Sequence, residues 1–189
     1  MYLFFSNRGK RTAFANDVLQ HCDGLYRYAL KLTKNEQEAE DLVQETLMKA
    51  FRSYSKTNAS SNYRAWAFTI LRNEFISRKR RSRREVSLDD VTSPEKLISE
   101  NTLAKPFADD WRQNVADDIH QALDRLGEVH RSVIVLCDIE GLTYEEISHV
   151  MQCPIGTVRS RVFHARRMLR ESLKTYAKTF SREEFDEAM

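Results

Sequence analysis

The sequence predicts an all-α chain made of two small helical domains joined by a flexible linker. Apolar residues recur at steps of three and four along most of the chain, which is the spacing that places side chains on one face of a helix. Gly and Pro, which interrupt helices, number only five and three in 189 residues. A stretch without this period begins near residue 85 and separates two periodic halves. These three observations favour two helical units over a single bundle.

The first half is predicted to form a bundle of three helices over residues 10–84. The apolar positions of the first helix are Phe14, Val18, Cys22, Leu25, Tyr26 and Ala29. The second helix starts at Asn35, which with Glu38 three residues later matches a capping box, and its apolar positions continue to Tyr54. After a polar loop over 56–62, the third helix begins at Tyr63 and ends in the basic run RKRRSRR.

Residues 85–112 are predicted to form the linker, because this acidic stretch lacks helical periodicity and contains Pro94 and Pro106. The second domain is predicted over 113–177. Its apolar pattern gives a first helix around 115–126 and a second helix that Gly141 ends, since glycine readily adopts the left-handed conformation.

A helix-turn-helix is predicted at the end of the second domain. Thr143 and Glu146 form another capping box, and the short helix that they open is broken by Gln152, Cys153 and Pro154. A long helix follows over 155–177, and the tail SREEFDEAM is expected to fray. Short helix, tight turn and long helix is the pattern that places a helix in the major groove of DNA.

The long helix carries two different faces. Val158, Val162, Ala165, Leu169 and Leu173 share the face that anchors it, and Arg159, Phe163, Arg166, Arg167 and Arg170 share another. A solvated basic surface explains the arginines as well as DNA binding does. Phe163 favours DNA, because a phenylalanine gains nothing in water but can contact a thymine methyl or a sugar. Thr157 and Ser160 in the first turn are positioned to contact phosphate.

Two further surfaces lie in the first domain. The third helix combines aromatic residues with its basic run, which suits bases released from a duplex, although burial in the core is the better explanation for any single aromatic residue. The second helix presents Asp41, Gln44, Glu45 and Met48 opposite its apolar face. Either an ordinary solvated face or a docking surface for a basic protein accounts for this set.

The composition excludes several classes of protein. Lys plus Arg number 30 and Asp plus Glu 28, so the net charge of +2 does not itself predict nucleic-acid binding. Three dispersed cysteines indicate neither disulfides nor zinc, and no apolar run approaches the length of a membrane span. We expect no enzyme activity, metal or cofactor: a di-metal bundle needs two Glu-x-x-His pairs, and the chain offers one, Glu146 with His149. A cytoplasmic protein without membrane insertion is expected.

Three segments in this order resemble the extracytoplasmic-function (ECF) sigma factors of bacterial RNA polymerase. AEDLVQETLMKAFRSY is similar to the part of region 2 that binds core polymerase, and YRAWAFTILRNEFISRKRR is similar to the promoter-melting segment. GLTYEEISHVMQCPIGTVRSRVFHARRML is similar to the helix-turn-helix of region 4. The resemblance extends from Leu25 to Leu173.

The resemblance implies roles for particular residues. The residues implied to bind core polymerase are Asp41, Gln44, Glu45 and Met48. Those implied to capture and melt the −10 element are Asn62, Tyr63, Trp66, Asn73, Arg78, Arg80 and Arg81. Those implied to contact the −35 element are Thr157, Arg159, Ser160, Phe163, His164, Arg166 and Arg167. His164 stands where many members of the family carry arginine.

The implied partners are core RNA polymerase, promoter DNA and an anti-sigma factor. The implied function is promoter-specific initiation of transcription, by recognition of the −35 and −10 elements and stabilisation of the melted strand. A stand-alone helix-turn-helix regulator is the alternative; it would not need the face from Asp41 to Met48 or the basic third helix, and it would usually dimerise on a palindrome.

Overall fold

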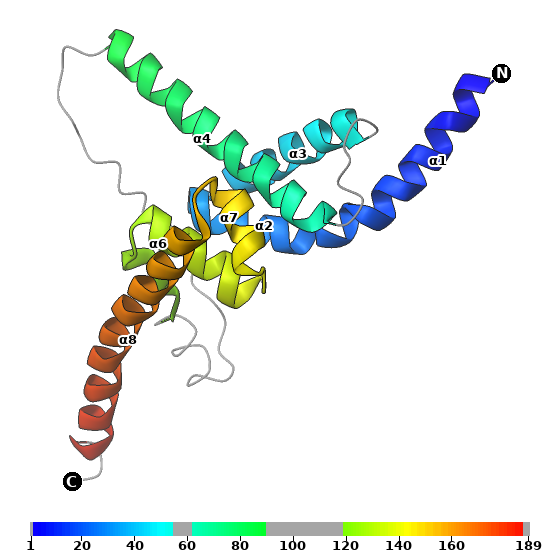
Figure 1. Ribbon diagram of the computed structural model, residues 1–189. Coiled ribbons are helices and arrows are strands. Elements are labelled where there is room, and N and C mark those ends of the chain that lie inside the picture. The colour runs from blue at the N-terminus through cyan, green and yellow to red at the C-terminus, as the bar shows by residue number, and fades with distance from the viewer. Residues whose placement is uncertain (1, 55–61, 90–118, 187–189) are drawn as a thin grey trace.

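A computed structural model describes the backbone of residues 2–54, 62–89 and 119–186. Within these residues every regular element is a helix, in agreement with the all-α prediction. Helices α1, α4 and α8 project in different directions from a central cluster that contains α2, α6 and α7 (Figure 1). Nearly all of the predicted linker, from residue 90, and the polar loop except Asn62 lie outside the described residues.

The predicted first helix is divided into three elements. They are α1 (Tyr2–Asp17), the 3₁₀ turn η1 (Leu19–His21) and α2 (Cys22–Thr33). The prediction of one continuous helix was therefore wrong. Val18, at φ −121°, interrupts the α-helical ladder, yet its side chain is fully buried. A 3₁₀ turn of three residues barely shifts the apolar spacing, so periodicity alone could not locate this break.

Local capping residues set the end of α2 and the start of α3. Lys34 adopts the left-handed conformation at φ 59° and ends α2. The Asn35 side chain then accepts a hydrogen bond from the Glu38 amide at 3.0 Å, and this cap opens α3 (Glu36–Ser53). The fourth helix, α4 (Tyr63–Asp89), continues five residues past the predicted end at Arg84.

The described C-terminal residues start with a helical stretch over 119–125, followed by α6 (Glu128–Ile134) and the π-helical turn η3 (Val135–Ile139). The predicted start of the first of these helices, over 115–118, lies outside the described residues. Gly141 follows at φ +65°, as its predicted role in ending the helix requires. Helices α7 (Tyr144–Met151) and α8 (Ile155–Asp186) come next. The backbone of α8 thus remains helical past Ala177, where the sequence pattern placed its end.

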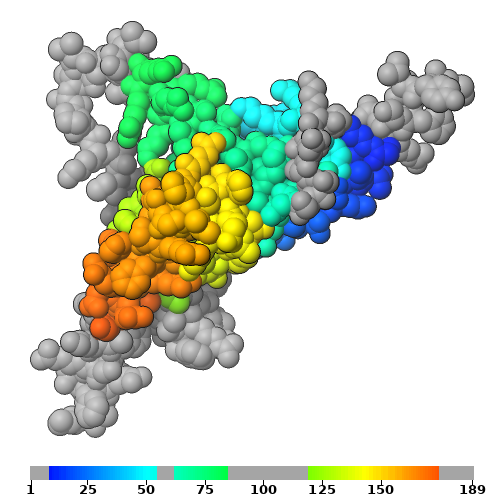
Figure 2. All heavy atoms as spheres, in the orientation of Figure 1, coloured from blue at the N-terminus to red at the C-terminus, as the bar shows by residue number. Residues whose placement is uncertain are grey.

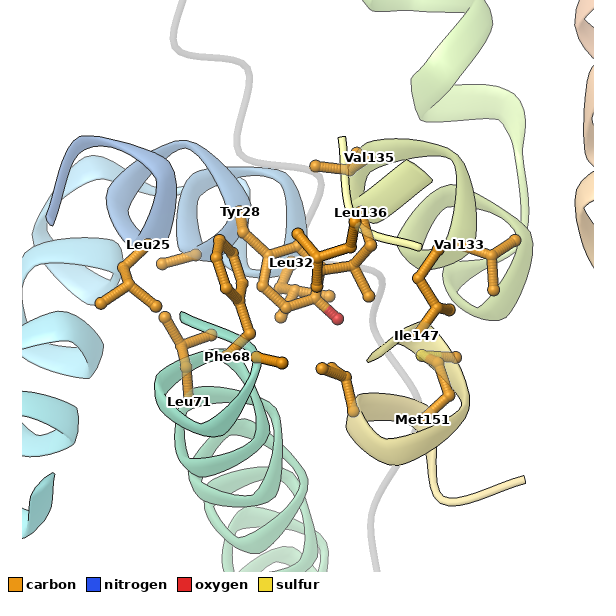
Figure 3. Packing of buried hydrophobic residues seen from close by; sticks show 14 of the residues in the cluster. Leu25, Tyr28, Leu32, Phe68, Leu71, Val133, Val135, Leu136, Ile147 and Met151 are labelled. Atoms are coloured by element: carbon orange, nitrogen blue, oxygen red, sulfur yellow. The ribbon is translucent and has the colours of Figure 1, made fainter. Parts of the chain in front are cut away.

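The two periodic halves of the chain share one core. Figure 3 shows Leu25, Tyr28 and Leu32 of α2 and Phe68 of α4 facing Leu136 of η3 and Ile147 of α7. All of these side chains are buried. The sequence predicted a core for each half, whereas apolar side chains from both halves pack together, and α7 lies against α4.

Candidate nucleic-acid interface

The helix-turn-helix is built by local hydrogen bonds. Thr143 accepts from the Glu146 amide at 3.2 Å, and the Glu146 carboxylate accepts from the Thr143 amide at 2.6 Å, so the predicted capping box is confirmed. Gln152 ends α7 in the left-handed conformation, at φ 51°. The Ser148 hydroxyl donates to the Cys153 carbonyl at 2.6 Å across the turn. These bonds fix the direction in which α8 leaves α7.

One face of α8 is fully buried and sets the orientation of the other. Val158, Val162 and Ala165 have almost no exposed surface, as predicted, and they pack in the core that the two halves share. Leu169 is partly buried against the same cluster. With this face anchored, the helix cannot rotate to hide the opposite face from solvent.

The opposite face carries a reading stripe, which we define as the exposed residues Arg159, Ser160, Phe163, His164 and Arg167. The Phe163 side chain is 64% exposed, more than any other large apolar side chain among the described residues. Its ring lies 5.5 Å from the ring of His164 in an edge-to-face arrangement. The stripe therefore combines two cations with an aromatic surface on the side facing away from the core.

Three of the predicted −35 residues, Arg166, Thr157 and Ser160, form hydrogen bonds within the chain. Arg166 donates to both carboxylate oxygens of Asp138, at 3.1 and 2.5 Å. This contact raises the pKa of the Arg166 guanidinium and lowers the pKa of Asp138. The Thr157 amide donates to the Pro154 carbonyl at 2.8 Å, and the Ser160 hydroxyl donates to the Thr157 carbonyl at 3.1 Å.

Aromatic side chains connect the start of α4 to the first helices. Tyr63 lies 5.3 Å from Tyr54 and 6.1 Å from Trp66, measured between ring centroids, and Tyr54 lies 5.5 Å from Phe14. Phe14 is buried, while Tyr63 and Trp66 are partly buried. Tyr63 and Trp66 therefore pack against the core while part of each residue stays exposed to solvent. Their role in holding unstacked bases stays a prediction.

Asn62 caps α4 and also contacts the second half of the chain. Its side-chain oxygen accepts from the Ala65 amide at 3.0 Å, and its amide nitrogen donates to Glu146 Oε1 at 2.5 Å. Burial raises the pKa of Glu146, but hydrogen bonds from Thr143 and Asn62 outweigh it and the net pKa is lowered. A predicted −10 residue thus binds a carboxylate of the helix-turn-helix.

The basic end of α4 is mostly open to solvent. Arg80 and Arg81 are exposed, and Arg78 and Asn73 are partly buried. Arg81 contacts the buried carboxylate of Glu74 at 3.2 Å. The positive charge of this segment therefore faces outward, with one arginine held by an internal acid.

The polar face of α3 is exposed as predicted. Asp41, Gln44 and Met48 face solvent, and the Met48 side chain is 51% exposed. Glu45 is partly buried and binds Arg78 of α4 at 3.2 Å. Three of the four residues are thus free for a protein partner in this arrangement, and the fourth links this face to the basic helix.

Sequence reasoning missed the residues that join the two halves. Glu140 is buried and contacts Arg27 of α2 and Arg64 of α4. The buried Arg131 of α6 donates to the Lys31 carbonyl of α2 at 3.3 Å, as well as to carbonyls near the end of helix 119–125. No spacing in the sequence relates residues about a hundred positions apart, so these pairings carry no periodic signal.

The described residues contain no group of three or more His, Cys, Asp or Glu side chains that could hold a metal. His149 is exposed, and Glu146 is occupied in its capping box. None of the helices within the described residues is both long and apolar enough to span a membrane.

Comparison with known proteins assigns the family. Residues 18–85 match the family model of sigma-70 region 2, and residues 116–169 match that of sigma-70 region 4. The chain is 35% identical over 156 residues to the ECF RNA polymerase sigma factor EcfG of Rhodopseudomonas palustris, covering 82% of this chain and 81% of that protein. The chain belongs to the ECF sigma factors. It is also 36% identical to the ECF RNA polymerase sigma factor SigE of Mycolicibacterium smegmatis, where the match covers 85% of this chain but 61% of the relative.

Solved structures agree with the sigma fold. The sigma factor RpoE of Bartonella quintana, crystallised with the anti-sigma factor NepR, superposes with a TM-score of 0.69 at 37% identity. The match covers 86% of this sigma factor and 97% of that chain. Membership of the family favours the sigma interpretation over a stand-alone regulator.

Proposed function

We propose that this ECF sigma factor joins core RNA polymerase, directs it to promoters with a −35 and a −10 element, and stabilises the melted −10 strand. Residues 10–84 act as region 2, 85–112 as the linker and 113–177 as region 4. The protein performs no covalent chemistry itself and works in the bacterial cytoplasm, where polymerase and promoter DNA are found.

The observation that carries the proposal is the reading stripe of α8. An exposed phenylalanine between cations, on a helix anchored by its opposite face, suits insertion into a major groove. Arg159 and Arg167 would contact base edges or phosphates, and Phe163 a thymine methyl. Because phosphate neutralisation supplies much of the affinity, promoter binding should fall steeply with salt.

Region 2 would carry two binding surfaces that a stand-alone regulator does not need, one for core polymerase and one for the −10 element. The exposed face of Asp41, Gln44 and Met48 suits a basic surface on core polymerase, where Glu45 would complete the contact. Tyr63, Trp66 and Asn73 would hold an unstacked base of the −10 element, and Arg78, Arg80 and Arg81 would follow the strand backbone. An anti-sigma factor is the further proposed partner, in line with the complex of the Bartonella relative.

In vitro transcription tests the proposal. Purified core polymerase would transcribe genomic fragments with and without the full chain, and start sites would be mapped. We expect new starts behind a shared two-part motif. A chain that neither co-purifies with core polymerase nor produces new starts would overturn the sigma function and favour the regulator.

A further inference from the structure

A buried carboxylate joins the two sigma regions. The Glu140 side chain, at the end of η3, is 1% exposed. Arg27 of α2 binds both of its oxygens, with Nε to Oε1 and Nη2 to Oε2 at 2.9 Å each. Arg64 of α4 lies 3.8 Å from Oε2 and also donates to the Glu140 backbone carbonyl. One residue of region 4 is thus held by two helices of region 2.

The surface of α2 is shaped to receive this carboxylate. Gly24 lies beneath it, and a Cβ atom at that position would stand 2.5 Å from Glu140 Oε2. Gly24 is the third residue of α2, and its lack of a Cβ atom leaves room for the carboxylate. The π turn of η3, closed by the Glu140 amide donating to the Val135 carbonyl at 2.8 Å, sets where the side chain leaves the backbone.

The same arrangement covers part of α4. Figure 2 shows α7 lying directly against the N-terminal half of α4. There the Asn62 amide is occupied by Glu146, and further along α4 the Lys79 ammonium binds Glu128 of α6. Asn62 is therefore not available to a base while the two regions are in contact.

We propose that Glu140 is an interdomain latch, which holds the free chain closed with α7 over the start of α4 and must be released before promoter DNA reaches Asn62. The role of α4 in DNA capture rests on the proposed function, whereas the closed state rests on the contacts alone. Once the regions separate, Glu140 returns to water and no longer needs Arg27. Loss of Arg27 therefore disfavours only the closed state, where the carboxylate is left buried without its main partner.

Zero-length cross-linking of the full chain reports the closed state directly. Carbodiimide activates a carboxylate, and a touching lysine amine then forms an amide while the activator leaves as a urea. Lys79 with Glu128, and Lys34 with Asp124 at 3.5 Å, are such pairs across the boundary. Lys174 and Glu171, 3.2 Å apart on α8, provide an internal standard that opening does not affect.

Two variants release the latch by different means. Arg27→Ala removes the partner of the carboxylate from an exposed position on α2. Gly24→Ala places a methyl group 2.5 Å from Glu140 Oε2, while its distance of 3.4 Å from the Phe68 ring is an ordinary van der Waals contact. Alanine is a better helix former than glycine, so α2 itself should persist in this variant. Asp138→Asn is the matched control, because it neutralises an acid two residues before Glu140 whose arginine partner lies within region 4.

We expect both interdomain cross-links in the wild type, with yields about tenfold lower relative to the α8 standard in Arg27→Ala and Gly24→Ala. Asp138→Asn should match the wild type, and helix content by circular dichroism should be unchanged throughout. Adding Glu140→Ala to Arg27→Ala should restore part of the cross-linking, since no buried charge is then left unpaired.

Wild-type cross-linking at the level of Arg27→Ala, or equal yields in all variants, would overturn the latch. When the sigma factor is limiting, Arg27→Ala should also give about tenfold more open promoter complexes with core polymerase. The reason is that a larger fraction of the chains is in the separated form that can bind promoter DNA. If Arg27→Ala loses the interdomain cross-links but forms no more open complexes than the wild type, the regulatory role is overturned. If neither the wild type nor any variant supports transcription while the cross-links are as expected, the proposed function is wrong. The closed state would still be supported by the cross-links.

Discussion

Replacing Phe163 with alanine tests whether the reading stripe touches bases. A phenylalanine side chain presents about 150 to 250 Å² of surface, so 64% exposure leaves roughly 130 Å² that DNA could cover. At about 25 cal/mol per Å², complete coverage would contribute roughly 3 kcal/mol, and coverage of one ring face about half of that. Phe163→Ala should therefore weaken binding to the −35 element by about tenfold.

The assay is fluorescence anisotropy of holoenzyme on a promoter taken from the start-site mapping. If the ring meets a thymine methyl, replacing that thymine with uracil should weaken wild-type binding by a similar factor. The uracil change should then add little in Phe163→Ala, because the two changes remove the same contact. Met168→Ala, which truncates another exposed apolar side chain of α8 outside the stripe, is the control.

Thermal unfolding separates this effect from damage to the fold. Truncation of an exposed side chain should leave the free energy of unfolding within about 0.5 kcal/mol of the wild type. Full affinity of Phe163→Ala for thymine-containing DNA would refute the contact. Loss of affinity with no response to uracil in the wild type would instead indicate a sugar as the partner of the ring.

Three other changes probe the remaining surfaces. Asp41→Lys should weaken binding to labelled core polymerase by about tenfold, whereas Glu40→Lys, the same charge change at a neighbouring exposed position, should not; equal affinities would count against the α3 interface. Arg131→Met should lower the free energy of unfolding in urea by about 3 kcal/mol, because it leaves several backbone carbonyls without their donor, while Arg167→Met at an exposed site serves as reference. The lowered pKa of Asp138 means that its ion pair stabilises the chain above the carboxyl's ordinary pKa of about 4 and loses this effect as the pH falls through the lower, folded-state pKa. The stability difference between wild type and Asp138→Asn should thus shrink on acidification below that value, and a constant difference would show that the charge is not its source.

Local sequence signals predicted much of this fold, whereas contacts between segments distant in the sequence could not be predicted from them. The caps at Asn35 and Thr143 and the left-handed Gly141 lie where the sequence placed them, because each depends on neighbours within a few residues. The apolar face of Val158, Val162 and Ala165 also followed from spacing alone.

The same reasoning failed where geometry couples distant segments. Nothing in the sequence shows that Glu140, just after η3, faces Arg27 of α2, since each is an ordinary charged residue in its own segment. Periodicity identified Leu25 and Ala29 of α2 as buried, but it missed Tyr28 and Leu32, which pack against region 4. The candidate site was therefore predictable as separate surfaces, whereas its internal contacts, such as Asn62 with Glu146, required the fold.

The shared core gives the contact between the regions a temperature dependence. Separating them would expose apolar side chains such as Leu32 and Leu136, and exposure of apolar surface raises the heat capacity. Apolar contacts weaken on cooling for the same reason. The fraction of free chain in which the two regions have come apart should consequently rise as the temperature falls, which makes this boundary a cold-labile contact.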